Sequence, residues 1–232
     1  MYATPGQSVN AFGQTANPGL KQTAFTPDDN RYNAGFPRLR TGLSNPLPVT
    51  PRPQEGGYSC WSTCAEMIME FLGRRVRQCE QASAHGDLSV WCCVNNELRR
   101  ECDAPNYPDF ERWGFNSTNQ FPNALTWDQV VTEIDEGRPF AFARSRNIPG
   151  NTISHMLVAI GYRETAGQPQ TREILCLNPR AFTTTDEETV AYSDYTGFPA
   201  VVTGNGIIPG STYTHELVYW EIHRAPPTPE NQ

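Results

Sequence analysis

The stretch Gln54-Glu-Gly-Gly-Tyr-Ser-Cys-Trp61, which runs directly into Ser62-Thr-Cys-Ala-Glu-Met-Ile-Met-Glu-Phe-Leu-Gly73, decides the expected fold. Its apolar residues recur at helical spacing on two neighbouring stripes. Because a helix that is apolar over so much of its circumference belongs in a core, this pattern predicts a buried helix over residues 60–72. Ser59 is a suitable N-cap for that helix, and Gly73 is a suitable residue to end it.

Cys60 stands at the first turn of the predicted helix. The positive end of the helix dipole favours the thiolate, which is the nucleophilic form of cysteine. Gln54 lies six residues earlier, and its amide can return to the same place and donate to a developing oxyanion. Most lone cysteines in helices are ordinary core residues. That simpler explanation leaves the glutamine, the glycine pair and the tryptophan at matching offsets unexplained.

The pattern Gln-x5-Cys-Trp at the start of a long buried helix resembles the papain-like cysteine peptidase clan. Ser59-Cys60-Trp61 matches the papain signature, whereas Gly57 stands where plant and animal members carry a cysteine. The chain therefore resembles the compact bacterial branch more closely, which includes effector proteases of plant pathogens and bacteriocin-leader peptidases. The resemblance covers roughly residues 50–225. It implies an α+β, papain-like fold, in which a helical subdomain led by the nucleophile helix packs against an antiparallel β-sheet subdomain.

Composition excludes several other classes of protein. The chain has 232 residues and a formal net charge of −7, so it lacks the basic footprint of a nucleic-acid-binding protein. The sequence contains no run of 18 apolar residues, so it predicts no membrane span, and its N-terminus does not resemble a Sec-type signal peptide. The motifs GxSxG, GxxxxGK[ST] and HExxH are also missing, and no cofactor is implied. We expect a secreted or exported protein that acts on a protein or peptide substrate.

Four of the seven cysteines lie close together among polar residues, and we expect them to form two disulfides. A bond between adjacent cysteines is strained, so each member of the adjacent pair should bond to one of the outer two. Zinc coordination with His85 is the alternative, but no CxxC pair is present and adjacent cysteines ligate one tetrahedral ion poorly. With Cys60 as the candidate nucleophile, the remaining two, Cys64 and Cys176, are expected to be buried free thiols. The disulfide candidates are Cys79, Cys92, Cys93 and Cys102.

The expected domain organisation has three parts. Residues 1–50 are rich in proline and show no lasting hydrophobic period, so we expect an extended or disordered tail. This tail could be an export signal, a propeptide or an arm that docks on a partner, and we expect it to be dispensable for folding. Residues 51–225 form the peptidase domain. Residues 226–232 form a short C-terminal tail.

The sequence pattern of the second half of the chain predicts one helix and several strands. Thr126 and Gln129 form a capping box ahead of an amphipathic helix that ends at Gly137, and a strand follows it. Further strands are expected at residues 153–162 and 172–179, with turn residues between them, and at 189–192, 200–203 and 216–223.

If residues 153–162 and 172–179 form an unbulged hairpin, its midpoint sets His155 directly opposite Asn178. Asn178 could then hold the imidazole while His155 accepts the proton of Cys60. In the resembling families this hairpin carries the catalytic histidine and then an Asn or Asp followed by Pro, which Asn178-Pro179 fits. His215 is a less favoured alternative base. The same triad could serve a cell-wall amidase, an isopeptidase or a transpeptidase, and a non-catalytic binding module on a papain scaffold is a further alternative.

Overall fold

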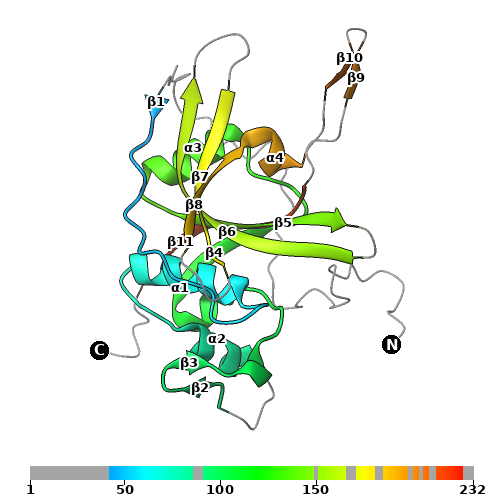
Figure 1. The fold of residues 1–232 in the computed structure, drawn as a ribbon. Helices are drawn as coiled ribbons and strands as arrows, with labels where there is room; N and C mark the ends of the chain where they lie inside the picture. The colour runs from blue at the N-terminus through cyan, green and yellow to red at the C-terminus, as the bar shows by residue number, and fades with distance from the viewer. Residues whose placement is uncertain are drawn as a thin grey trace, which may run out of the picture.

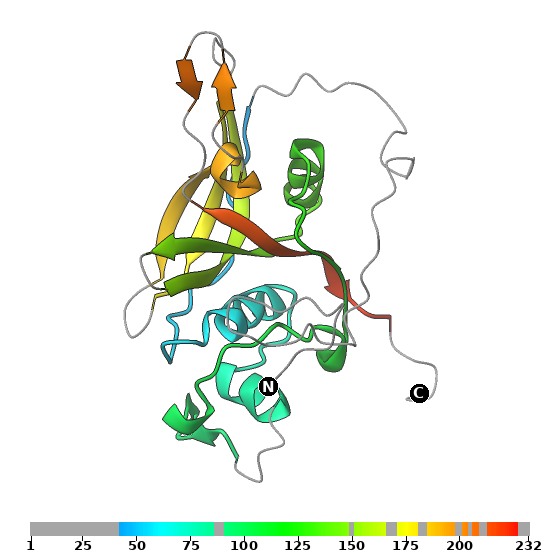
Figure 2. The same cartoon turned by 90° about the vertical axis from the view of Figure 1, so that its right-hand side faces the viewer.

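The computed structural model describes residues 42–85, 91–148, 151–165, 171–180, 185–197, 201–203, 206–208 and 213–226. Within these residues the fold is α+β, as expected, with one large antiparallel sheet and helices on both of its faces (Figures 1 and 2). Helices α1 (Cys60–Phe71) and α2 (Gln78–His85) lie on one side of the sheet. Helices α3 (Trp127–Asp135) and α4 (Tyr192–Thr196) lie on the other.

The strands of the large sheet follow the order β4-β11-β5-β6-β7-β8, and β1 pairs with β6 beside this path. All of these pairings are antiparallel. Strands β9 (Val201–Thr203) and β10 (Gly206–Ile208) form a separate hairpin. The large sheet consists of β1 (Gly42–Leu43), β4 (Phe115–Gln120), β5 (Phe140–Ile148), β6 (Asn151–Thr165), β7 (Thr171–Asn178), β8 (Asp186–Ala191) and β11 (Thr214–Arg224).

Helix α1 is buried along most of its length, as its two apolar stripes predict. It ends where Gly73 adopts a φ of 89°, a conformation that favours glycine. The predicted N-cap differs in detail. Ser59 occupies the N-cap position, but its hydroxyl accepts from the Gly56 amide at 2.9 Å and makes no capping bond to the helix. The hydroxyl therefore stabilises the loop that leads into α1.

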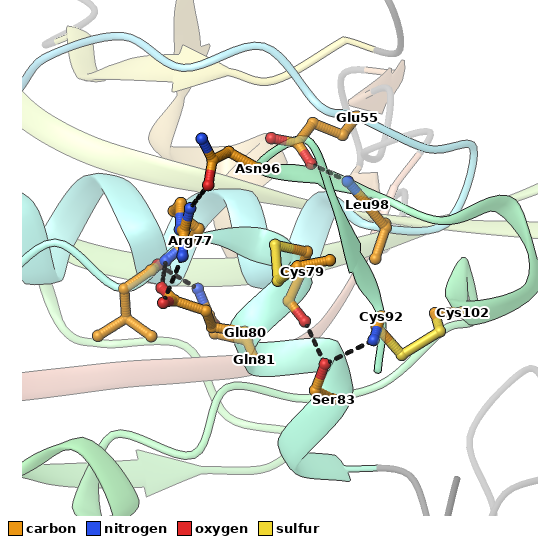
Figure 3. The surroundings of a disulfide bond; sticks show 12 residues. Glu55, Arg77, Cys79, Glu80, Gln81, Ser83, Cys92, Asn96, Leu98 and Cys102 are labelled. Carbon is orange, nitrogen blue, oxygen red and sulfur yellow. Dashed lines mark hydrogen bonds and ion pairs between the residues drawn. A yellow bond between two sulfur atoms is a disulfide. The ribbon is translucent and has the colours of Figure 1, made fainter. Parts of the chain in front are cut away.

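A small disulfide-bonded unit follows α1. It contains α2, the hairpin of β2 (Cys93–Val94) and β3 (Glu97–Leu98), and the 3-10 turn η2 (Arg100–Cys102). The disulfides join Cys92 to Cys102 (Figure 3) and Cys79 to Cys93. This confirms that each adjacent cysteine bonds to one outer cysteine. Cross-links suit this unit, because it buries few apolar side chains of its own.

The sheet separates two apolar cores. One lies between α1 and the sheet and includes Met67, Ile68 and Tyr219. The other lies beneath α3 and α4 and includes Trp127 and Tyr195. The capping box that starts α3 is present as predicted: the Gln129 amide donates to the Thr126 hydroxyl at 3.3 Å, and the Gln129 side chain accepts from the Thr126 amide at 2.8 Å. The 3-10 turn η3 (Glu111–Trp113) leads into β4.

The described chain begins with a segment that packs on the sheet. Strand β5 pairs with β6 only as far as Ala159, and residues 42–47 cover the same edge of β6 beyond that point. The Leu47 amide donates to the Ile160 carbonyl at 2.8 Å, and Val49 is buried in the α1 core. The packed domain thus begins before residue 50, the expected boundary of the tail. Residues 1–41 of that tail and 227–232 of the C-terminal tail lie outside the described residues.

Candidate active site

A cavity of about 140 Å³ opens where the N-terminus of α1 meets β6. Cys60 and His155 both line it, so the fold brings together two predicted site residues that are far apart in sequence. The walls are mainly apolar and come from α1 and the loop ahead of it, from β5, β6 and β11, and from the loop at residues 105–107. Neither Gln54 nor Asn178 is among the described residues that line it.

Cys60 is a partly exposed free thiol at the first residue of α1. Its pKa is raised, because burial disfavours the thiolate. Backbone hydrogen bonds from Met156, Trp61 and Cys60 itself oppose this shift without reversing it. The helix dipole was expected to favour the thiolate, but desolvation outweighs the favourable dipoles and the net shift of the pKa is upward. The bond with Met156 also shows that the sulfur lies beside the residue that follows His155.

His155 and Asn178 meet across β6 and β7, with His155 Nε2 at 2.7 Å from Asn178 Oδ1. The predicted register that set them directly opposite is wrong, since Val158 pairs with Leu177 and Asn178 falls opposite Leu157 by extension. A diagonal pair two residues apart along the strands is still within reach of a long side chain. The contact therefore exists without the expected pairing.

A β-bulge at Ile160 makes this diagonal contact possible. The ladder pairs Gly161 with Leu175 on one side of the bulge and Ala159 with Cys176 on the other, so Ile160 is an extra residue in β6. Without it, the register nearer the turn would set Asn178 opposite Val158. Because successive strand residues point to opposite faces, Asn178 would then lie on the other face of the sheet from His155.

Glu188 of β8 fixes the orientation of the Asn178 amide. Asn178 Nδ2 donates to Glu188 Oε2 at 2.5 Å. A carboxylate can only accept, so the amino group of Asn178 must face Glu188 and its oxygen must face the imidazole. His155 Nε2 then carries the proton, and Nδ1 is left with the lone pair that a base needs. Burial lowers the pKa of His155, while the bond to Asn178 raises it.

Arg144 extends this network and was not anticipated from the sequence. It lies on β5 directly opposite His155, is only 6% exposed, and places Nη2 at 2.5 Å from Glu188 Oε1. Its guanidinium carbon also lies 4.1 Å from the centroid of the Tyr213 ring. No local motif marks Arg144 or Glu188, because they meet only once three strands are in register.

Gln54 is buried just ahead of the loop that leads into α1, at 4% exposure. Its Nε2 donates to the Gly56 carbonyl at 2.6 Å, and its backbone amide donates to the Arg180 carbonyl at 3.2 Å. Its Oε1 is buried without a hydrogen-bond partner among the described residues. An amide nitrogen has two hydrogens, and the bond to Gly56 uses one of them.

Asp103 ties the disulfide-bonded unit to the approach to the nucleophile. Its carboxylate accepts from the Gly57 amide at 2.7 Å and from the Tyr58 amide at 2.9 Å. A Cβ atom on Gly56 would lie 2.2 Å from Asp103 Oδ1, so a side chain at this position would displace the Asp103 carboxylate. These two bonds hold the approach to Cys60 in place. Asp103 also follows Cys102 directly and precedes the cavity-lining residues 105–107.

The other candidate residues lie away from the cavity. His215, the alternative base, is buried against Tyr195, where burial lowers its pKa to about 4. Cys64 and Cys176 are buried free thiols, as expected. The four cysteines that were the alternative ligands of a zinc ion are instead bonded to one another in two disulfides.

The model of the Peptidase_C39 like family matches residues 46–198. This chain belongs to that family. It is therefore a cysteine peptidase, and its resemblance to the papain-like clan is confirmed. No curated protein matches the chain.

The part of this cysteine peptidase that the family model covers includes Cys60, His155, Asn178 and Glu188, and ends before β11. A peptidase acts on protein or peptide substrates. In the described part of the chain, no helix combines the length and apolar character needed to cross a membrane.

Proposed function

We propose that the peptidase hydrolyses peptide bonds with Cys60 as nucleophile, His155 as general base and acid, and Asn178 as the residue that orients the imidazole. The observation that carries this proposal is the shared cavity of Cys60 and His155, together with the 2.7 Å contact between His155 Nε2 and Asn178 Oδ1. That contact leaves the lone pair of His155 on Nδ1, the nitrogen that accepts the thiol proton.

In this mechanism His155 Nδ1 removes the proton from Cys60 as the sulfur attacks the substrate carbonyl. The imidazolium then donates that proton to the leaving amine, and the C–N bond breaks to give a thioester. A water molecule loses its proton to Nδ1 and attacks the thioester. The acid product leaves and the thiol is restored. Because the pKa shifts of Cys60 and His155 both favour the neutral forms, we expect proton transfer to accompany attack by the thiol.

The oxyanion of each tetrahedral intermediate is assigned to the Cys60 backbone amide and the Gln54 side chain. Two observations support this role for Gln54. Its side chain is buried, and only one of its two amide hydrogens is used, in the bond to the Gly56 carbonyl. To reach the oxyanion, the second N–H must turn toward the cavity once substrate is bound. Gln54→Ala should then lower kcat by about 100-fold.

We further propose that this peptidase works outside the reducing cytosol, where disulfides persist. Two cystines in one small unit support this location. Residues 1–41 would serve as an export signal, a propeptide or an arm that docks on a partner. An exported peptidase of this kind could act as an effector, on proteins of another cell.

The test uses the full chain and a set of internally quenched peptides. Cys60→Ala should abolish hydrolysis, and His155→Ala should lower kcat/KM by about 10²- to 10⁴-fold, the range of a general base. Asn178→Ala should be milder, because Asn178 orients and does not react. Cys64→Ala removes the other thiol of α1, one turn from Cys60, and should retain activity.

Intact-mass measurement after treatment with iodoacetamide identifies the reactive thiol. We expect one adduct on the native protein, and none on Cys60→Ala. Hydrolysis by Cys60→Ala at the wild-type rate would overturn the assignment. Labelling of Cys60 without hydrolysis of any peptide would indicate a binding module. Release of peptidoglycan fragments, with no peptide hydrolysed, would indicate an amidase instead.

A further inference from the structure

The cavity beside the nucleophile has one feature that hydrolysis itself does not use. Its walls are largely apolar and include Trp61, Tyr107, Ala143 and Met156. Among the described residues that line it, Glu216 is the one carboxylate. A single carboxylate at the edge of an apolar pocket is unfavourable unless a cation meets it, because apolar walls weaken its solvation and strengthen its attraction to positive charge.

A second β-bulge directs Glu216 into this cavity. Strand β11 pairs His215 with Arg144 and Leu217 with Ala143, so Glu216 is an extra residue in the ladder. On one side of the bulge His215 packs in the core under α4, whereas Leu217 on the other side packs in the α1 core. The bulge therefore turns Glu216 and Leu217 toward the α1 side of the sheet together.

Ser154 holds the Glu216 side chain. Its hydroxyl donates a short hydrogen bond to Glu216 Oε2, and Ser154 also lines the cavity, directly before His155. Among the described residues, no lysine or arginine forms an ion pair with Glu216. The carboxylate is thus positioned by a neutral donor, which leaves its charge for a group that enters from outside.

We propose that this cavity binds a lysine or arginine side chain of the substrate, with Glu216 as the residue that recognises its charge. The methylene stem of a lysine or arginine packs well on apolar surface, so the apolar walls would contact the stem. Glu216 would then bind the charged end. The inference rests on the proposed function, because it assumes that the peptide lies across Cys60. Glu216 lies beyond the span that the family model covers.

The experiment compares matched peptides that differ in one residue. At each of the four positions before the scissile bond, lysine is compared with norleucine, which has a similar stem without the charge, and with glutamate. At one position, wild-type kcat/KM should be about 10- to 100-fold higher for lysine than for norleucine, as a charge-assisted hydrogen bond predicts. Glu216→Gln should bring that ratio close to one, and Glu216→Lys should favour the glutamate peptide.

The ratio is measured on one preparation at a time, so partial unfolding of a variant does not change it. Glu97→Gln makes the same charge change on the β2–β3 hairpin, away from the cavity, and should keep the wild-type ratio. A wild-type ratio near one at all four positions, or an unchanged ratio in Glu216→Gln, overturns the inference while leaving the peptidase assignment intact. Failure to hydrolyse any peptide contradicts the proposed function and this inference with it.

Discussion

Asn178 Nδ2 lies 2.5 Å from Glu188 Oε2, so the amide beside the imidazole is itself held by a carboxylate. In the β7–β8 ladder Asn178 pairs with Asp186 and Glu188 pairs with Cys176, which makes this a diagonal contact on one face of the sheet. His155, Asn178, Glu188 and Arg144 thus form a chain of contacts that begins at the cavity and ends on a buried guanidinium. Glu188 is a positioning residue in this arrangement.

Glu188→Gln should lower kcat by about 10- to 100-fold with little change in KM, because a glutamine can present its own amino group to Asn178 and turn the amide around. The negative charge of Glu188 raises the pKa of His155, so the acidic limb of the pH profile of kcat/KM should also move to lower pH. Glu187→Gln, at the exposed neighbouring position of β8, is the control. An unchanged profile in Glu188→Gln would contradict the positioning role.

The second prediction concerns the resting state of the nucleophile. Burial raises the pKa of Cys60, so the rate of alkylation by iodoacetamide should climb steadily between about pH 7 and about pH 10, as thiolate forms. His155→Ala should leave this climb in place. A rate that is flat in this range in the wild type, and becomes pH-dependent in His155→Ala, would show instead that a thiolate–imidazolium pair forms in the free enzyme.

A third prediction tests the link between the disulfide-bonded unit and the cavity. Asp103→Ala removes the acceptor of the Gly57 and Tyr58 amides, and the loop ahead of Cys60 should become less ordered. We expect KM to rise by about tenfold, with a small change in Tm because these bonds are exposed to solvent. Asp109→Ala also removes a carboxylate that accepts from a backbone amide, and should leave KM unchanged.

The fourth prediction separates the tail from the domain. Deletion of residues 1–41 should leave the Tm close to that of the full chain. Deletion of residues 1–48 also removes the bonds of Ser44 with Tyr162 and of Leu47 with Ile160, and exposes an edge of β6. At about 1 kcal/mol for each hydrogen bond, the longer deletion should cost on the order of 3 kcal/mol of unfolding free energy. Equal Tm values for the two truncations would show that residues 42–48 add nothing to stability.

Local patterns predicted the elements, whereas the contacts between strands could not be predicted in detail. The stripes of α1 and the capping box at Thr126 depend on residues within a few positions of one another, so the sequence displays them directly. Pairing of His155 with Asn178 depends on the register of a hairpin. That register is set at the turn, where Thr165 pairs with Thr171, and the bulge at Ile160 then shifts it by one residue. A bulge arises from packing on both faces of the sheet, for which a linear pattern contains no marker.

The same limit explains which site residues were missed. Glu188 and Arg144 read as ordinary polar residues of strands, and their roles follow only from the neighbours that the sheet gives them. The thiol of Cys60 illustrates a different limit. Its place at a helix N-terminus was evident from the sequence, but the desolvation of its sulfur by the surrounding chain was not, and desolvation decides the direction of its pKa shift.

The disulfide between Cys92 and Cys102 and the free thiol of Cys60 make opposite demands on the storage buffer. Strong reductants protect the nucleophile but break the disulfide next to Asp103. The Asp103 carboxylate holds Gly57, which lines the cavity. Without reductant the cross-link survives, while the nucleophile is open to mixed-disulfide formation with small-molecule disulfides. A batch treated with excess dithiothreitol would therefore have its nucleophile fully reduced and still turn over substrate slowly. Specific activity and active-site concentration will diverge according to the history of the sample.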